Sequence, residues 1–178
     1  MSTVSKKICL IGDFGVGKTS LIRRFVDRQF SDNYLSTVGV KISRKTVELE
    51  NIQQQEKLDL QLLIWDLEGH TKFKAIAPSY LQGSSGAVIV LDASRLETIE
   101  RVSEHIKLFL SVNKKGVIFL ALNKSDLVDE EKLEKQLAQL SQISEHAQVL
   151  AIYSTSAKTG IYVDEIFLTL AYKILTPA

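Results

Sequence analysis

The sequence has a single cysteine, almost no net charge and no long apolar run. Cys9 is the only cysteine among 178 residues, so no internal disulfide can form, and we expect a reducing, cytoplasmic location. Lysine and arginine number 22 against 21 aspartate and glutamate, a net charge of +1, which gives no basis for binding nucleic acid or anionic lipid. No apolar run approaches the ~20 residues of a membrane span, and the N-terminus resembles no signal peptide.

Apolar residues follow two different periods along the chain. Continuous apolar runs at 88–91 and 117–122 are typical of parallel strands buried on both faces, whereas residues 58–64 alternate as in a half-buried strand. The polar stretch 50–57 indicates a solvated hairpin connection. Helical spacing of apolar residues marks the stretches 99–110, 133–140 and 163–174. The alternation predicts an α/β fold with one doubly wound, mostly parallel sheet that binds ligands beyond its strand carboxyl ends.

A glycine-rich segment directly follows the apolar run at 8–11. It reads G-D-F-G-V-G-K-T-S from Gly12 to Ser20, the pattern of a phosphate-binding loop between a strand and a helix. Glycine lets the backbone fold closely around an anion, and the helix start adds its positive dipole end. Lys18 would reach the β- and γ-phosphates, and the Thr19 hydroxyl would ligate Mg²⁺. The nucleotide-contacting residues expected here are Asp13, Phe14, Gly15, Val16, Gly17, Lys18, Thr19 and Ser20.

A second motif follows the apolar run at 117–122. Asn123, Lys124, Ser125 and Asp126 spell N-K-S-D at the expected end of a buried strand. The Asp126 carboxylate can accept hydrogen bonds from N1–H and the N2 amino group of guanine, whereas adenine offers no such donor pair. Alone, the motif would also fit a turn followed by a helix cap. Downstream of a phosphate-binding loop, it favours a guanine nucleotide.

In order and spacing, these segments resemble the small GTPases of the Ras superfamily, and most of all the Rab branch. The resemblance covers residues 6–175 of a single domain, 1–178. It implies a P-loop fold with a six-stranded sheet, and binding of GDP and GTP with Mg²⁺. The segments that carry it are the loop at 12–20, S-T-V-G-V at 36–40, W-D-L-E-G at 65–69, N-K-S-D at 123–126 and S-A-K at 156–158.

The resemblance assigns further residues to the phosphates and the metal ion. Thr37 is implied to ligate Mg²⁺ in the triphosphate state and to release its loop once the γ-phosphate is lost. Asp66 is implied to hold the same ion through water. Gly69 is implied to present its N–H to the γ-phosphate, and Lys18, Gly69 and His70 would act in hydrolysis.

The base side of the site is assigned in the same way. Phe30 and Tyr34 occupy the family's aromatic positions at the base and over the phosphates. The aliphatic stem of Lys124 would cover one face of the guanine. The residues implied to complete the base pocket are Asn123, Lys124, Asp126, Ser156, Ala157 and Lys158, with the Ala157 N–H available to guanine O6.

Protein partners are implied by the resemblance as well. Effectors, exchange factors or activators would contact the switch regions and the triad Ile42, Trp65 and Tyr80, where one aromatic of the usual Rab triad is missing. The sequence ends at Ala178 without the cysteine that prenylation requires, so we expect no lipid anchor in this chain.

The second switch departs from the family pattern D-T-A-G-Q. This chain has D-L-E-G-H at 66–70, so His70 replaces the glutamine that orients the attacking water. Glu68 adds a carboxylate near the γ-phosphate, and Phe14 adds a ring near the path of an arginine finger. We therefore expect a GTPase that hydrolyses GTP slowly. Two alternatives remain open at this stage: a pseudo-GTPase that holds guanine nucleotide without significant hydrolysis, and an ATP-using P-loop kinase.

Overall fold

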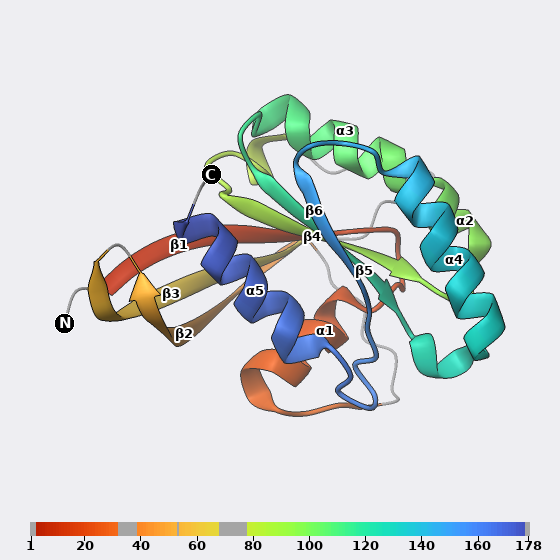
Figure 1. Ribbon diagram of the computed structural model, residues 1–178, viewed down its shortest axis with the longest axis horizontal. Helices are drawn as coiled ribbons and strands as arrows, with labels where there is room; N and C mark the ends of the chain where they lie inside the picture. The colour runs from red at the N-terminus through yellow and green to blue at the C-terminus, as the bar shows by residue number, and fades with distance from the viewer. Residues whose placement is uncertain (1–2, 32–38, 53, 68–77, 177–178) are drawn as a thin grey trace.

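A six-stranded, mostly parallel sheet flanked by helices confirms the expected fold class (Figure 1). The computed structural model describes residues 3–31, 39–52, 54–67 and 78–176. The strands are β1 (Thr3–Ile11), β2 (Val40–Ile52), β3 (Gln55–Leu67), β4 (Gly86–Asp92), β5 (Val117–Asn123) and β6 (Val149–Ser154), in the spatial order β2-β3-β1-β4-β5-β6. The helices are α1 (Lys18–Asp27), α2 (Leu96–Glu100), α3 (Val102–Val112), α4 (Glu130–Ile143) and α5 (Val163–Leu175), with the 3₁₀ turns η1 (Pro78–Tyr80) and η2 (Ser125–Leu127).

Strand β1 lies inside the sheet, between β3 and β4, and its apolar residues face both sides. It pairs in parallel with β3 and with β4, whereas β2 runs antiparallel to β3 at the edge. The chain leaves β1 toward β2 and β3 and then crosses back to β4. The carboxyl end of β1 is therefore the point at which the strand order reverses, and in sheets of this kind the ligand binds in the crevice beyond such an end.

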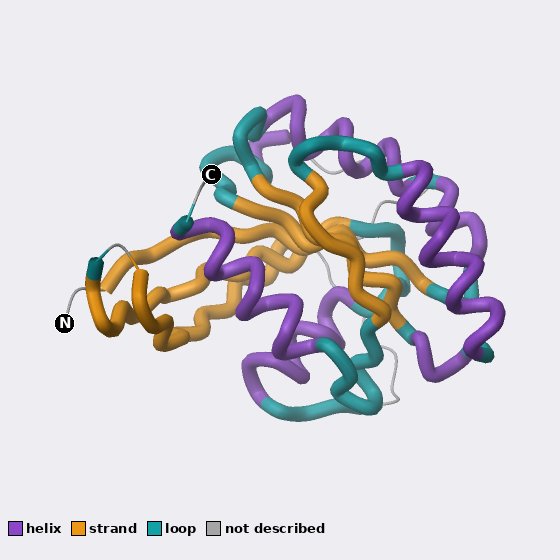
Figure 2. Tube along the Cα trace, viewed as in Figure 1, coloured by secondary structure: helices purple, strands orange, loops and turns teal. Residues whose placement is uncertain are grey.

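Two apolar cores lie on the two faces of the sheet, because neighbouring strand residues point to opposite sides. Ile8 and Leu10 join the core that α1 and α5 cover, whereas Cys9 and Ile11 join the core beneath α2, α3 and α4. Figure 2 shows these helices as two groups around the strands. Cys9 is fully buried, as expected for a thiol that acts as a small apolar side chain. The sheet is thus fixed from both sides, which holds its strand ends in place.

Two sequence-based expectations need correction. The described polar residues of 50–57 are exposed, as expected, but most of the stretch is not a connection: β2 continues to Ile52 and β3 starts at Gln55, with Glu50 paired to Lys57. Its polar residues alternate with the buried Ile52 and Leu58, so the strands extend to the tip of the hairpin. The apolar stretch 99–110 forms two helices rather than one, because Arg101, at φ −91° and ψ 3°, interrupts the helix.

Within the ranges described above, no helix is both long and apolar enough to cross a membrane.

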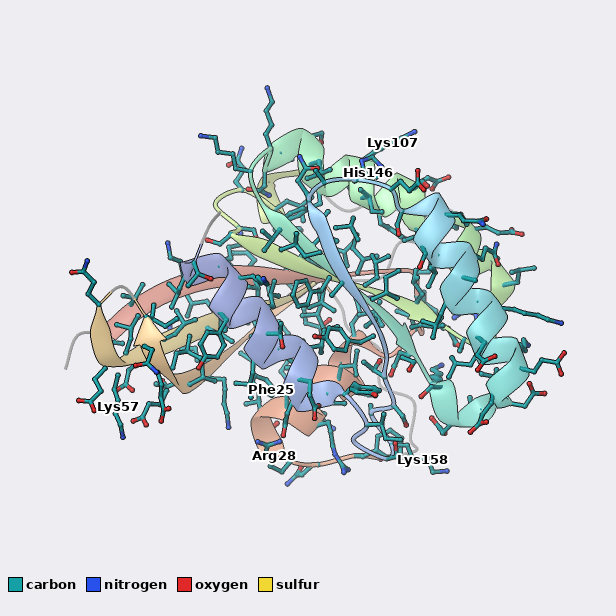
Figure 3. The ribbon with its side chains drawn as sticks, in the orientation of Figure 1. Phe25, Arg28, Lys57, Lys107, His146 and Lys158 are labelled. Atoms are coloured by element: carbon teal, nitrogen blue, oxygen red, sulfur yellow. The ribbon has the colours of Figure 1, made fainter. Side chains whose placement is uncertain are left out.

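Ring stacking joins α1 to α5 and provides a test of the core that these two helices cover. Phe25 and Phe167 stack with ring centroids 4.4 Å apart and an interplanar angle of 11°, and Figure 3 shows Phe25 beside α5. Phe167→Ala should lower the free energy of unfolding by about 3–5 kcal/mol, because it removes a fully buried ring and leaves a cavity. Leu168→Ala, at the next and partly exposed position, should change it by about 0.5 kcal/mol or less. Urea unfolding at equal ligand concentration measures both, and equal losses would contradict this view of the core.

Candidate functional site

Four parallel strands end at one edge of the sheet, and each contributes to a single site. The phosphate-binding loop follows β1, Asp66 lies near the end of β3, and Asp92 and Asn123 are the last residues of β4 and β5. Asp66, Asp92 and Asn123 are all at most 1% exposed. The loop thus lies among buried polar side chains at the point of strand-order reversal.

The glycines of the loop are required by close contacts. A Cβ at Gly12 would lie 2.4 Å from the Val90 carbonyl oxygen, so only glycine lets the loop leave β1 against β4. Gly17 has φ +107°, and a Cβ there would lie 2.3 Å from Asn123 Nδ2. Helix α1 starts directly afterwards, at Lys18, which confirms the expected order of strand, loop and helix.

Side-chain donors hold the carbonyl groups of the loop. Lys18 Nζ donates to the carbonyls of Gly12 and Asp13, at 3.0 and 3.1 Å. Asn123 Nδ2 donates to the carbonyl of Val16 at 3.0 Å. These bonds fix the carbonyls of Gly12, Asp13 and Val16, which a loop that turns N–H groups toward an anion requires.

Two more cations donate directly to the middle of the loop, and both lie near the Asp92 carboxylate. Lys124 Nζ donates to the carbonyl of Gly15 at 2.8 Å and lies 2.9 Å from Asp92 Oδ2. Arg95 donates to the carbonyl of Phe14 at 2.8 Å, and its guanidinium lies 3.9 Å from the same carboxylate oxygen. Asp92 therefore neutralises two cations that fix the loop.

The Lys18 ammonium is enclosed within the site. Burial lowers the pKa of Lys18 to about 8, against the raising effect of the carboxylates of Asp66 and Asp13. A buried ammonium of this kind gains from an anionic ligand, because phosphate oxygens replace the water that it has lost.

Thr19 and Asp66 form an oxygen pair at the start of α1. Thr19 Oγ1 donates to Asp66 Oδ2 at 2.5 Å. A hydroxyl and a carboxylate are hard oxygen donors, which suit Mg²⁺. Their placement beside the loop fits an ion that would accompany a polyphosphate. Thr37, the third residue expected at the metal, lies outside the described residues.

The base-side segments meet next to the loop. Ser156 Oγ donates to Asp126 Oδ1 at 2.8 Å, which orients that carboxylate. Thr155 Oγ1 donates to Asn123 Oδ1 at 3.1 Å, so the loop after β6 is tied to the loop after β5. Ala157 is nearly buried in the same segment, and the neighbouring Lys158 lies at the outer edge of the molecule (Figure 3).

Several expected site residues lie outside the described residues: Tyr34, Thr37, Glu68, Gly69 and His70. Phe30 is described, and it is partly buried against the core that α1 and α5 cover. Phe14 is 44% exposed on the loop. All the other residues expected at the phosphates and the base are brought together at one edge of the sheet.

Of the three residues of the expected partner surface, Ile42 and Trp65 are neighbours in the sheet, and Lys7 links Trp65 to Tyr80. Ile42 of β2 pairs in register with Trp65 of β3 and is exposed. Lys7 connects Trp65 to Tyr80: its ammonium lies 3.6 Å from the Trp65 ring centroid and donates to the Tyr80 carbonyl at 2.7 Å. A cation over an indole ring stabilises the ring's position.

Sequence reasoning missed four residues of the site: the acid Asp92 and the basic residues Arg95, Arg101 and His105. Asp92 carried a usable signal, because it is an acid directly after the apolar run 88–91. Arg95, Arg101 and His105 carried none. Arg95 precedes α2, Arg101 lies between α2 and α3, and His105 lies on α3, so they reach the loop only in the folded chain.

Comparisons with known proteins agree with this arrangement. The family model described as "Ras family" matches residues 7–176. Human Ras-related protein Rab-22A is 35% identical over 172 residues, which cover 94% of this chain and 82% of that protein. Ras-related protein Rab-13 of Canis lupus familiaris is 36% identical over 170 residues, covering 95% and 79%. GTP-binding protein ypt5 of Schizosaccharomyces pombe is 33% identical over 173 residues, covering 97% and 79%.

The close approach of Gly17 to Asn123 gives a testable prediction. Gly17→Ala should lower the free energy of unfolding by about 2 kcal/mol more than Gly83→Ala, because the new methyl group must displace a buried, hydrogen-bonded amide. Gly83 is a matched control: it also has a positive φ, +75°, but nothing lies within 4 Å of its Cβ position. Urea unfolding without nucleotide measures both variants. Equal losses would show that backbone strain alone accounts for the effect.

Proposed function

Because this chain belongs to the Ras family of small GTPases and is similar to Rab proteins over nearly its whole length, we propose that it is a molecular switch that binds GDP and GTP with Mg²⁺ and hydrolyses GTP slowly. Membership of the family implies GTP binding and GTP hydrolysis. The observation that carries the proposal is the contact of the N-K-S-D segment with the phosphate-binding loop, through Asn123 to Val16 and Lys124 to Gly15.

Guanine is selected by Asp126. Its carboxylate accepts from Ser156, and the same group can accept from the N1–H and N2 amino donors of guanine. The backbone of Lys124 supports this geometry: it takes a left-handed conformation, φ 62° and ψ 36°, at the turn into η2. That turn sets Asp126 beyond the end of β5 while the Lys124 ammonium reaches back to the loop. Base preference also separates this function from that of an ATP-using kinase.

The phosphates are bound by the loop and by Lys18. The Lys18 ammonium lies buried between the carbonyls of Gly12 and Asp13, so it is positioned before a nucleotide arrives. Thr19 and Asp66 would hold Mg²⁺, with Thr37 joining them over a triphosphate. When bound, this ion neutralises part of the charge on the β- and γ-phosphates. The γ-phosphate contacts of Thr37 and Gly69 would make the switch loops sensitive to its loss.

Slow hydrolysis is proposed from the residues that depart from the family. Hydrolysis requires a group that both donates to the γ-phosphate and accepts from the attacking water, and His70 does so only as a neutral imidazole. Glu68 would add negative charge to a reaction that already concentrates it. A pseudo-GTPase that retains its nucleotide is the second candidate, and the same departures favour it.

Partners of this chain are proposed to be regulators or effectors that read the nucleotide state. Rab-family GTPases bind such proteins through their switch regions. Here the exposed Ile42 and Tyr80 flank Trp65, which lies against Lys7. A partner that packs on this triad would therefore contact a tryptophan that is already oriented, which lowers the entropic cost of binding.

Base selectivity is tested by Asp126→Asn. The variant should lose at least about 100-fold in GDP affinity, because the guanine donors would face an amide N–H instead of a carboxylate. It should gain affinity for xanthine nucleotides, whose carbonyl at that position accepts from the new amide. Fluorescent-nucleotide titration measures both. Asp129→Asn, which keeps a residue able to cap α4, is the control and should bind GDP normally. Unchanged GDP affinity in Asp126→Asn would refute guanine readout by this residue.

Hydrolysis is tested by single-turnover phosphate release at saturating Mg²⁺. The wild type should hydrolyse GTP no faster than ~10⁻⁴ s⁻¹, the scale of unassisted Ras-like proteins. His70→Gln alone should give a modest gain, because Phe14 and Glu68 remain. The triple change Phe14→Gly, Glu68→Ala and His70→Gln should accelerate hydrolysis at least about tenfold, or about 1.4 kcal/mol of barrier.

Two outcomes would contradict this account of hydrolysis. A wild-type rate of ~10⁻² s⁻¹ or faster would mean that these residues form an effective alternative arrangement. A slower rate in the triple variant would lead to the same conclusion. Retention of intact GTP over many hours by the wild type would instead favour the pseudo-GTPase.

A further inference from the structure

The second residue of the phosphate-binding loop is a carboxylate that lies against α3. Asp13 is 5% exposed, and its Oδ1 lies 3.1 Å from Nε2 of His105, which is 3% exposed. The same oxygen lies 3.3 Å from Nε of Arg101 at the start of α3. Two basic side chains, one from the N-cap of α3 and one from within that helix, thus lie near a single oxygen of the loop.

The partners of Asp13 play different parts. A carboxylate only accepts hydrogen bonds, so Nε2 of His105 must carry the hydrogen in this contact. Arg101 Nε forms no hydrogen bond by its geometry with any described residue, and its contribution is that of a nearby positive charge. Arg101 also lies 3.6 Å from Glu104. His105 therefore orients the Asp13 carboxylate, and Arg101 neutralises it.

A carboxylate in this loop is a liability for phosphate binding. Lys18 donates to the backbone carbonyl of Asp13 at 3.1 Å. The Asp13 carboxylate therefore belongs to a residue that the Lys18 ammonium already contacts, in a buried site. A carboxylate that turned toward Lys18 would pair with it and would repel the phosphates, since charges interact strongly where water is excluded. The loop needs Asp13 to be held away from the nucleotide.

We propose that His105 and Arg101 are positioning residues for nucleotide binding: they hold and neutralise the Asp13 carboxylate against α3, so that the Lys18 ammonium remains available to the phosphates. This inference rests on the proposed function, because it takes Lys18 as the phosphate ligand. It adds residues of α3, which touch neither base nor phosphate in the proposed arrangement, to those that set nucleotide affinity.

The experiment is a double-mutant cycle on nucleotide affinity. Dissociation constants for fluorescent GDP and a non-hydrolysable GTP analogue are measured, well below the melting temperature, for Arg101→Met, His105→Leu and His105→Gln, each with Asp13 and with Asp13→Asn. Arg101→Met and His105→Leu should weaken binding about tenfold in the Asp13 background. His105→Gln should retain most of the affinity, because its amide can still donate to the carboxylate.

The decisive result is the loss of these effects once the carboxylate is gone. In the Asp13→Asn background, Arg101→Met and His105→Leu should change affinity by less than about twofold. Glu104→Gln is the matched control, since it removes the other ion pair of Arg101 but leaves the contact with Asp13, and it should bind as the wild type does. Because Arg101 is partly exposed, Arg101→Met decides the question even if His105→Leu fails to fold.

Each contrary outcome has one meaning. Equal losses with Asp13 and with Asp13→Asn would show that His105 and Arg101 act only as structural residues, and would overturn the inference. Unchanged affinity in Arg101→Met and His105→Leu would overturn it as well, while leaving the proposed function intact. Failure of the wild type to bind guanine nucleotide would overturn both.

Discussion

The site depends on how the carbonyl groups of the phosphate-binding loop are held. A loop that turns its N–H groups toward an anion needs other donors for its carbonyl oxygens, because a buried carbonyl without a hydrogen bond destabilises the fold. In this chain the donors come from three places in the fold: Lys18 of α1, Arg95 before α2, and Asn123 and Lys124 at the end of β5. The loop conformation therefore depends on residues from several segments that meet at this edge of the sheet.

Buried carboxylates complete this arrangement by neutralising the cations. Asp92 lies against Lys124 and Arg95, Asp13 lies against Arg101, and the charges of Asp66 and Asp13 act on Lys18. An isolated buried charge would be expensive, but a set of paired charges fixed before the ligand arrives costs little reorganisation on binding. The two apolar cores make this possible, because they hold the strand ends from both faces of the sheet.

The residues that depart from the family pattern are Phe14 in the phosphate-binding loop and Glu68 and His70 in the second switch. Phe14 has a fixed carbonyl, which Arg95 holds, and an exposed ring. The ring consequently stands beside the phosphate site without being part of either core. The residues that hold the loop carbonyls are thus different residues from those that depart from the family pattern.

The sequence by itself determined the fold class and the order of strand, loop and helix, because apolar periodicity and the motif at 12–20 are local patterns. It also pointed to Asn123, Lys124 and Asp126, which directly follow a buried strand. It did not show that the two strands continue into the exposed, polar stretch 50–57, or that Arg101 divides the helical stretch 99–110. Only the tertiary structure decided that Arg95, Arg101 and His105 reach the loop. Contacts between residues up to 92 positions apart leave no periodic signal, since they arise where the sheet and its helices bring distant segments together.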